Sequence, residues 1–369
     1  MTGGLRLVVL GLSLSSSWGN GHATTYRALL RAFAARGHEV TFLERDVPWY
    51  AAHRDLVDPD WCRLVLYDDL GALDRHRDEI RRADAVIVGS YVPDGVAVGQ
   101  LVQDLAEGVR AFYDIDTPVT LAKLARGEFE YLSPDLIPGY DLYLSFTGGP
   151  TLREIERRYG SPAARALYCS VDPDLYPARD LPQRWDLSYL GTYSPDRQPV
   201  LDRLLIDPAR RCPDLRFVVA GPQYPDDLDW PDNVERLPHV GPADHPEFYG
   251  VSRYTLNVTR ADMVAAGWSP SVRLFEAGSC GVPIISDRWP GLESILAPGR
   301  DILLAESADE VIGILRDRSE DERRQLAAAG RARVSREHTS AHRAETLERY
   351  LREATSVRGH AEAGLLVGS

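Results

Sequence analysis

Residues 5–43 read LRLVVLGLSLSSSWGNGHATTYRALLRAFAARGHEVTFL. The run Leu5–Gly11 is short, apolar and continuous, which is typical of a strand buried on both faces of a parallel sheet. The apolar residues of the next segment keep the spacing of one helix face, at Tyr26, Leu29, Leu30 and Phe33. Gly37 ends this helix, and Glu39–Leu43 is the next expected strand. This order of strand, helix and strand predicts a βαβ unit of a parallel sheet.

The same alternation continues along the chain in two series. In the first series, further strands are expected at residues 64–67, 85–89, 109–114, 141–146 and 166–169. In the second series, they are expected at residues 187–190, 215–220, 234–237, 254–258, 282–286 and 302–304. Between the two, VDPDLYPARDLPQR (residues 171–184) carries prolines and charges without a period, which is typical of an inter-domain linker.

These patterns predict an α/β protein with two doubly wound, Rossmann-like domains that face each other across a cleft. At roughly 150 residues per domain, a chain of 369 residues is long enough for both. The expected division is an N-terminal domain (1–170), a linker (171–185), a C-terminal domain (186–338), a helix that packs back on the N-terminal domain (339–355) and a disordered tail (356–369). Ligands of such domains bind at the carboxyl ends of the strands.

The composition excludes several classes of protein. The chain is 44% hydrophobic and 26% charged, which is ordinary for a soluble globular protein. A net charge of −13 disfavours nucleic acid as a partner. No apolar run reaches the ~18–20 residues of a membrane span, and the four cysteines have no metal-binding spacing, so we expect a cytoplasmic protein with reduced thiols. Lys123 is the only lysine among 42 basic residues, which is typical of a GC-rich, bacterial genome.

The loop after the first strand is the first candidate site. A glycine-rich turn before a helix exposes backbone N–H groups and lets a ligand approach closely. The stretch Gly19–Gly21 lacks the third glycine of a dinucleotide fingerprint, which disfavours a nicotinamide cofactor. His22 stands at the start of the helix. It either helps to cap the helix or packs at the loop, or it acts as a base or a substrate-binding group. A neutral imidazole can act as a base because it accepts a hydroxyl proton near neutral pH.

The second candidate is Asp116, in the sequence FYDIDTP at the end of an expected strand. Asp114 and Asp116 are two residues apart, and this spacing occurs freely in strands, so a metal site is the least favoured interpretation. The neighbouring Thr117 and Pro118 indicate a turn. Asp116 is therefore either a polar substrate contact or second base, or a residue that caps the turn.

The third and fourth candidates lie in the second series of strands. Ser271 is expected to cap a helix whose N-terminus attracts anions, with Arg273 one turn in for a phosphate and Glu276 on the same helix face for a ribose. The alternative is a surface ion pair between Arg273 and Glu276, worth under ~1 kcal/mol. A second strand–turn–helix loop offers Gly191, Thr192, Tyr193 and Arg197. Other residues on the same rim are Gly221, Pro222, His239, Asn257 and Arg260.

The stretch SVRLFEAGSCGVPIISDRWPGLESILAPGRDILL (271–304) resembles the donor-sugar segment of the glycosyltransferase group 1 clan, and most closely its spore-maturation-type branch. CSVDPDLYP (169–177) resembles the linker of that clan. The resemblance implies a GT-B fold, with Arg273 serving the diphosphate and Glu276 the ribose of a nucleotide-sugar donor.

Residues 21–40, GHATTYRALLRAFAARGHEV, are similar to the opening of inverting natural-product glycosyltransferases, in which the histidine at the position of His22 is the general base. Retaining members of the clan often carry an acid eight residues before the ribose glutamate, and Trp268 stands there instead. Retention and inversion therefore both stay open.

The resulting hypothesis is a glycosyltransferase that moves a sugar from a nucleotide diphosphate sugar to an acceptor hydroxyl or other nucleophile, without a metal or other cofactor. The acceptor, expected to be a small soluble molecule, enters near Trp18, Asn20, Gly21, His22, Tyr91 and Asp116. Two alternatives remain: a nucleotide-sugar epimerase or hydrolase on the same fold, and a non-catalytic protein that binds nucleotides or sugars.

Overall fold

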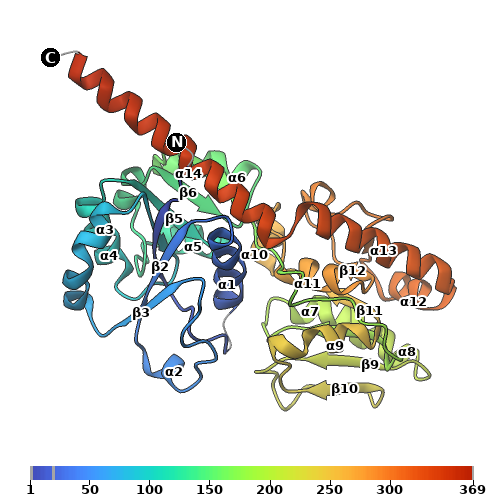
Figure 1. Cartoon of the computed structure of the whole chain (residues 1–369). Coiled ribbons are helices and arrows are strands. Elements are labelled where there is room, and N and C mark those ends of the chain that lie inside the picture. Colours follow the sequence, from blue (N-terminus) through green and yellow to red (C-terminus); the bar gives the residue numbers. More distant parts are fainter. Residues whose placement is uncertain (1–2, 19–20, 368–369) are drawn as a thin grey trace. The chain divides into compact units, whose positions relative to one another are not determined.

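The structure is a computed structural model that describes residues 3–18 and 21–367. The chain forms two compact units, each built on a parallel sheet (Figure 1). Unit 1 comprises the residues up to Cys169 and those from Ser340 onward, and unit 2 comprises Ser170–Thr339. The predicted class, an α/β protein of two doubly wound domains, is confirmed.

Unit 1 contains a seven-stranded sheet with the order β3-β2-β1-β4-β5-β6-β7. Its strands are β1 (Arg6–Gly11), β2 (Glu39–Arg45), β3 (Arg63–Tyr67), β4 (Ala85–Gly89), β5 (Val109–Asp114), β6 (Leu142–Ser145) and β7 (Ala164–Ala166). In β1, Leu7 lies in register with Val40 on one side and Ala85 on the other. The strand order reverses between β1 and β4, which is where such sheets bind ligands. The last strand lies at 164–166 and not at the expected 166–169.

Helices cover both faces of this sheet, because successive residues of a strand point to opposite faces. Val8 and Leu10 belong to the core on one face, and Leu7 and Val9 to the core on the other. The helical segments are α1 (Gly21–Ala34), α2 (Pro48–Ala51), η1 (Leu70–His76), α3 (Arg77–Arg82), α4 (Gly95–Leu105), α5 (Thr117–Arg126), η2 (Pro134–Gly139) and α6 (Pro150–Tyr159).

The last helix, α14 (Ser340–Val367), belongs to unit 1 (Figure 1). Leu347 and Leu351 of α14 share a core cluster with Leu29 and Phe33 of α1. We expected this helix to end near residue 355 and a disordered tail to follow from 356, but the backbone stays helical to Val367. The sequence after 355 contains no proline, and Gly359 and Gly364 lie within the helix, so no residue of this stretch ends the helix before Val367.

Unit 2 repeats the doubly wound order in a six-stranded sheet, β10-β9-β8-β11-β12-β13. Its strands are β8 (Trp185–Leu190), β9 (Phe217–Ala220), β10 (Val234–Leu237), β11 (Ser252–Asn257), β12 (Ile284–Ser286) and β13 (Leu303–Leu304). Its helical segments are α7 (Gln198–Leu201), η3 (Asp202–Ile206), α8 (Asp207–Arg211), η4 (Pro242–Asp244), α9 (His245–Gly250), α10 (Ala261–Ala266), α11 (Val272–Cys280), η5 (Leu292–Ser294), α12 (Ala308–Asp317) and α13 (Glu320–Glu337). The strand order reverses between β8 and β11.

The segment expected as a linker, 171–185, lies in unit 2 and packs against it. Tyr176 is buried there, and its carbonyl oxygen accepts a hydrogen bond from Ser279 Oγ at 2.8 Å. The prolines and charges of residues 171–184 are typical of a free linker. Tyr176 nevertheless anchors this segment to α11.

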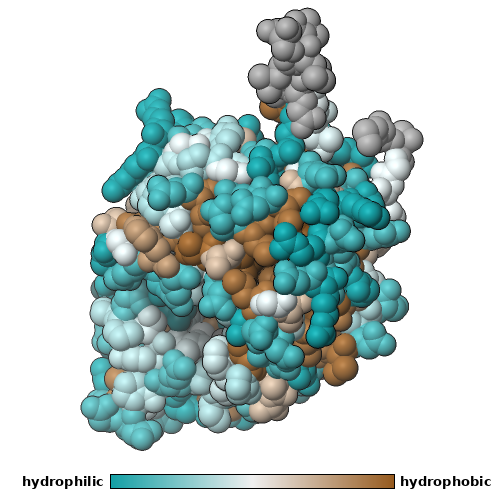
Figure 2. Space-filling view, turned by 90° about the vertical axis from the view of Figure 1, so that its left-hand side faces the viewer, coloured by the Kyte–Doolittle hydropathy of each residue, from teal (hydrophilic) through white to brown (hydrophobic). Residues whose placement is uncertain are grey.

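The surface agrees with the composition. In the face drawn in Figure 2, hydrophilic side chains predominate and hydrophobic ones gather toward the middle. The four cysteines are buried free thiols, as predicted. In the described part of the chain, no helix is long and apolar enough to cross a membrane.

Candidate active site

In unit 2, the loops that follow β8 and β9 lie against each other at two glycines. Gly221 has a φ of +143°, and a Cβ added to it would lie 2.1 Å from the carbonyl oxygen of Gly191. The two loops are joined by hydrogen bonds from Gly191 N to Ala220 O at 2.9 Å and from Tyr193 N to Pro222 O at 3.0 Å. Only glycine fits at position 221, since both the backbone conformation and the close approach exclude a side chain.

Arg197 lies at the start of α7, directly after the first of these loops. Its Nη2 donates a hydrogen bond to the carbonyl oxygen of Thr192 at 2.5 Å, which turns the side chain back over the loop. Its Nε is buried without a hydrogen-bond partner in the part of the chain that the structure describes. A guanidinium with an unused donor is suited to a phosphate oxygen.

Arg273 and Glu276 form a hydrogen-bonded ion pair on one face of α11, as their spacing predicts. Arg273 Nη1 donates to Glu276 Oε2 at 3.0 Å, and Arg273 Nε donates to the carbonyl oxygen of Leu190 at 3.1 Å. The second bond places Arg273 under the end of β8, beside Gly191. One third of the Arg273 side chain is exposed, so it remains open to a ligand.

Glu276 is more enclosed than the sequence suggested. Its side chain is 3% exposed, and its Oε1 accepts a hydrogen bond from Tyr176 Oη at 3.0 Å. His245 Nδ1 lies 3.6 Å from Oε2. Burial acts to raise the pKa of this carboxyl, but the charge of Arg273 and the neighbouring donors outweigh burial and lower the pKa to about 2. A contact between Glu276 and a ribose requires that the carboxylate exchange one of these partners.

The other predicted residues of unit 2 lie along the same edge. Ser271 caps α11, and its Oγ accepts from Arg273 N at 3.3 Å. Asn257, the last residue of β11, is buried and donates to Ser286 Oγ at 3.0 Å, so it holds neighbouring strands together. His239 follows β10 and is exposed, whereas Arg260 precedes α10 and is half-buried.

Sequence reasoning missed Arg236, which holds the loop after β9. Its guanidinium lies 4.1 Å from the ring centre of Tyr224 and 4.4 Å from that of Trp230. It also donates to the carbonyl oxygens of Val219 and Gly221, at 2.5 and 3.3 Å. Burial lowers the pKa of Arg236. Nothing in the local sequence signals this cluster, because its aromatic members lie six to twelve residues away.

In unit 1, the loops after β1, β4 and β5 bring three predicted residues together. The ring of His22, the second residue of α1, packs edge-on against Tyr91, with 5.3 Å between ring centres. Tyr91 Oη donates to Asp116 Oδ2 at 3.0 Å. Tyr91 has a φ of +63°, a conformation that non-glycine residues adopt at a cost and that clusters at functional sites. Burial lowers the pKa of His22 to about 4, so its imidazole is neutral at pH 7.

Asp114 and Asp116 have different surroundings although they are two residues apart. Asp114 is fully buried and accepts hydrogen bonds from Tyr143 Oη at 2.6 Å and Thr120 Oγ1 at 2.8 Å. Burial raises the pKa of Asp114 to about 6. Asp116 lies at the N-cap of α5 and is half-buried. Across residues 3–18 and 21–367, no group of three or more His, Cys, Asp or Glu is arranged to hold a metal.

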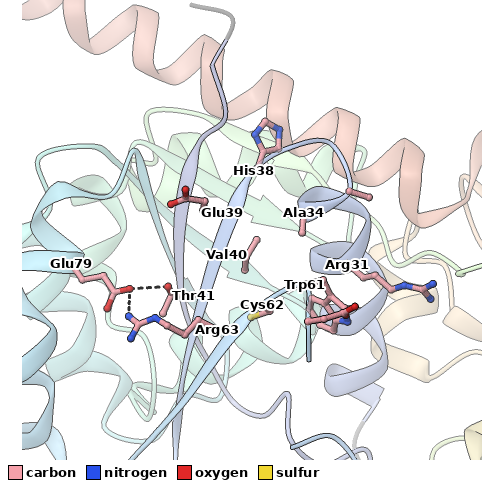
Figure 3. Close-up of a pocket in the computed structure, with 12 residues that line it drawn as sticks. Arg31, Ala34, His38, Glu39, Val40, Thr41, Trp61, Cys62, Arg63 and Glu79 are labelled. Carbon is pink, nitrogen blue, oxygen red and sulfur yellow. Dashed lines mark hydrogen bonds and ion pairs between the residues drawn. The ribbon is translucent and has the colours of Figure 1, made fainter. Parts of the chain in front are cut away.

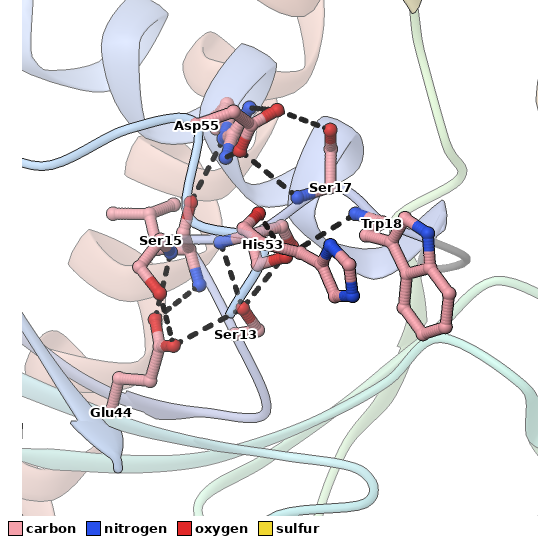
Figure 4. A network of polar contacts seen from close by, with 10 residues as sticks. Ser13, Ser15, Ser17, Trp18, Glu44, His53 and Asp55 are labelled. Atoms are coloured by element: carbon pink, nitrogen blue, oxygen red, sulfur yellow. Dashed lines mark hydrogen bonds and ion pairs between the residues drawn. The ribbon is translucent and has the colours of Figure 1, made fainter. Parts of the chain in front are cut away.

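The loop before α1 is held by a residue that sequence reasoning missed, Glu44 at the end of β2 (Figure 4). This buried carboxylate accepts hydrogen bonds from the backbone N–H groups of Leu14 and Ser15, at 2.6 and 2.8 Å. Trp18 follows in the same loop and is exposed. Gly21 begins α1 and is exposed, and Asn20 lies outside the described residues.

A further cavity, of about 860 Å³, lies at the other edge of the sheet of unit 1, beside the first residues of β2 and β3 (Figure 3). Its wall carries both signs of charge, including Arg63 and Glu79, which are paired with each other. None of the predicted site residues lines it. The carboxyl edges of both sheets therefore remain the candidate sites.

Residues 197–349 match the family model described as glycosyl transferase-like. No curated protein matches the chain.

Many solved structures share the fold. A sucrose-phosphate synthase from Thermosynechococcus elongatus superposes with a TM-score of 0.69 at 16% identity, covering 96% of this chain and 100% of that one. Anabaena HepE in complex with UDP and glucose gives a TM-score of 0.68 at 12% identity, over 95% of this chain and 100% of that one. An alpha-glucosyltransferase in complex with UDP gives 0.70 at 12% identity, over 94% and 100%. The chain has the GT-B fold of these glycosyltransferases.

Proposed function

We propose that the protein is a metal-independent glycosyltransferase that uses a nucleotide diphosphate sugar, and that the nucleotide is UDP. The observation that supports this most directly is the carboxyl edge of unit 2. Arg197 and Arg273 both lie beside the end of β8, next to a loop whose Gly221 lies against the backbone of Gly191. UDP is present in two of the structures that share the fold, HepE and the alpha-glucosyltransferase.

In the proposed reaction, the two arginines and the N-terminus of α11 stabilise the diphosphate. The bond from the anomeric carbon to the diphosphate oxygen breaks, and negative charge grows on that oxygen. Preorganised positive groups lower the free energy of this charge in the transition state, which is the role of a metal in other enzymes. Buried Glu276 keeps the guanidinium of Arg273 oriented, and we propose that it reaches the ribose by exchanging its bond from Tyr176.

On the acceptor side, we propose that His22 is the general base of an inverting transfer. The acceptor oxygen attacks the anomeric carbon while its proton moves to the neutral imidazole, and UDP leaves with the bonding electron pair. A pKa near 4 keeps His22 free of a proton at pH 7, although it also makes it a weak base. Tyr91 and Asp116 then orient the acceptor beside it. In a retaining reaction, His22 binds the sugar or the acceptor.

The acceptor is proposed to be a small molecule. The net charge of −13 disfavours a nucleic acid, although a structure of the alpha-glucosyltransferase holds a 13-mer DNA. Duplex DNA therefore belongs in the acceptor panel as a control. We expect it neither to bind nor to accept a sugar.

The donor site is tested by calorimetric titration of the full chain with UDP, UDP-glucose, GDP and ADP, with and without EDTA. We expect UDP to bind equally well in both. We expect about a ten- to hundredfold loss of affinity in Arg197→Ala and in Arg273→Ala, since a lost charged hydrogen bond costs about 1.5–3 kcal/mol. Arg210→Ala is the matched control, because Arg210 lies on α8 and its guanidinium pairs with the exposed carboxylate of Asp229.

Absence of UDP binding in the folded wild-type protein would contradict the donor site. Binding that is lost with EDTA would contradict metal independence. Release of free sugar from UDP-glucose, with no acceptor able to suppress it, would favour the hydrolase alternative.

A further inference from the structure

We propose that the face of Trp18 is a stacking platform for a planar aromatic ring of the acceptor, so that the acceptor is an aromatic alcohol. The identification of the stacked ligand as an acceptor rests on the proposed glycosyl transfer. The identification of Trp18 as a stacking platform rests on the geometry of unit 1.

The side chain of Trp18 is exposed, but a neighbouring ring holds its indole in place. Its side chain is 53% exposed, yet its indole lies nearly parallel to the imidazole of His53, with 4.3 Å between ring centres and 14° between planes. His53 therefore supports one face of the indole. A large aromatic ring that is supported on one side and open to solvent is the arrangement that a second planar ring completes by stacking.

The loop that carries Trp18 is held unusually firmly (Figure 4). Besides its two backbone donors, the Glu44 carboxylate accepts hydrogen bonds from the hydroxyls of Ser13 and Ser15, at 3.2 and 2.6 Å. Ser16 Oγ donates to the carbonyl oxygen of His53 at 2.8 Å, which ties the loop to the residue under the indole. A buried carboxylate satisfied by four donors fixes the loop before any ligand arrives, and such preorganisation lowers the entropic cost of binding.

A second tie runs through Asp55. Its carboxylate accepts from Ser17 N at 3.1 Å and from Arg27 Nη1 at 3.2 Å, so the residue next to Trp18 is joined to α1. Ser15 O also accepts from the backbone N–H groups of Asp55 and Leu56, both at 3.0 Å. The support under Trp18 thus comes from two segments of chain, the loop itself and residues 53–56.

The position of the platform matches the acceptor site. His22 follows Trp18 by four residues, so their Cα atoms lie no more than about 14 Å apart. The ring of His22 also has aromatic neighbours, because the Tyr91 ring packs against it and against Tyr131, with 4.6 Å between the tyrosine ring centres. The Cα separation of Trp18 and His22 is within the reach of an acceptor that stacks on Trp18 and presents a hydroxyl to His22.

The charges nearby favour a neutral ring. Arg27 is already paired with Asp55, so the cation nearest to Trp18 in this network is engaged, and the net charge of −13 disfavours an acceptor that carries its own carboxylate or phosphate. The binding energy must then come from stacking and apolar contact, which an exposed indole supplies.

The test is binding of 2-naphthol to the full chain, measured by ligand-observed NMR titration. Its saturated analogue, decahydro-2-naphthol, and methyl glucoside serve as probes of equal or similar size without an aromatic ring. The variants are Trp18→Leu, which removes the ring, and Trp18→Phe, which keeps a smaller one. Trp49→Leu is the matched control, since Trp49 on α2 is 57% exposed and has no parallel ring beneath it among the described ring contacts.

We expect 2-naphthol to bind the wild type and Trp49→Leu equally, about tenfold more weakly in Trp18→Leu, and with intermediate affinity in Trp18→Phe. Equal affinity in the wild type and Trp18→Leu overturns the proposal. Equal losses in Trp18→Leu and Trp49→Leu overturn it too, since they indicate a general apolar surface. Tighter binding of methyl glucoside than of 2-naphthol overturns the aromatic acceptor and indicates a carbohydrate acceptor instead.

UDP titration of the same variants separates this inference from the proposed function. If UDP binds every variant and 2-naphthol binding does not depend on Trp18, the platform alone is wrong. If 2-naphthol binding depends on Trp18 and UDP binds to none of the proteins, the aromatic site stands and glycosyl transfer from UDP is wrong.

Discussion

The phenol oxygen of Tyr91 lies 3.0 Å from Oδ2 of Asp116, and it links two loops that leave neighbouring strands of the same sheet. Burial and the Asp116 carboxylate both raise the pKa of this phenol, so it stays protonated and donates. The same ring packs edge-on to His22. Tyr91 therefore fixes the relative position of the two residues proposed to handle the acceptor.

Substitution of Tyr91 by Phe tests this link. The variant keeps the ring against His22 and loses only the bond to Asp116, so we expect about a tenfold fall in kcat with little change in KM for UDP-glucose. Steady-state kinetics with the identified acceptor measures it. Tyr140→Phe is the control, because the Tyr140 hydroxyl is buried without a hydrogen-bond partner in the described part of the chain, and its loss should leave kcat unchanged.

The lowered pKa of His22 predicts a pH dependence of stability. Burial holds the pKa near 4 in the folded state, whereas an unfolded chain has the ordinary value of 6.5. Between these values the unfolded state binds the extra proton, so the free energy of unfolding falls as pH drops from about 6.5 toward 4. Chemical denaturation at pH 7 and pH 5 measures the fall, which should be smaller in His22→Gln than in the wild type. An equal fall in both proteins contradicts the assignment.

The lowered pKa of Glu276 predicts that the free energy of unfolding changes in a different pH range. Its pKa is about 2 in the folded protein and 4.5 ordinarily, so its contribution to stability is complete above about 4.5 and disappears as pH falls toward 2. Glu276→Gln leaves Arg273 without its counter-charge, and breaking a buried pair in this way costs about 3–5 kcal/mol at pH 7. Denaturation curves should show the gap between variant and wild type narrowing from pH 5 to pH 3.

Tyr176→Phe provides the matched comparison for that experiment. It removes one hydrogen bond to the Glu276 carboxylate and keeps the ion pair with Arg273. We expect a loss of about 1.5–3 kcal/mol, smaller than that of Glu276→Gln. A larger loss than in Glu276→Gln would contradict the ion pair with Arg273 as the main contribution of Glu276 to stability.

The contacts of Arg236 predict that this residue stabilises the loop after β9. Arg236→Leu removes two cation–π contacts and two hydrogen bonds to backbone carbonyls, and we expect a loss of about 2 kcal/mol. Arg236→Lys keeps the charge over the rings but not both hydrogen bonds, so it should lose less. Thermal unfolding ranks the variants, and a Tm for Arg236→Leu equal to that of the wild type would exclude a role in holding this loop.

Much of the fold follows from local patterns of residues. The apolar runs at β1, β4 and β5 can be buried on both faces only in a parallel sheet, and the periodic stretches between them form the covering helices. His22 and Arg197 were chosen as site candidates because they lie in loops or helix starts after strand ends, where parallel topology gathers loops, and Arg273 because it lies in the first turn of a helix. The place of residues 171–184 was missed because packing against α11, a distant part of the chain, decided it. The end of α14 was missed because no proline stops the helix after residue 355.

The sequence alone determined the order of strands and helices and the class of two doubly wound α/β domains, because these depend on periodicity along the chain. It also predicted the sheet edge at which we expect ligands to bind. The tertiary structure decided which side chains meet. Glu44 reaches Ser15 from 29 residues away, and Tyr176 reaches Glu276 from 100. Such bonds depend on a folded core to bring the partners within 3 Å, and no local spacing encodes them.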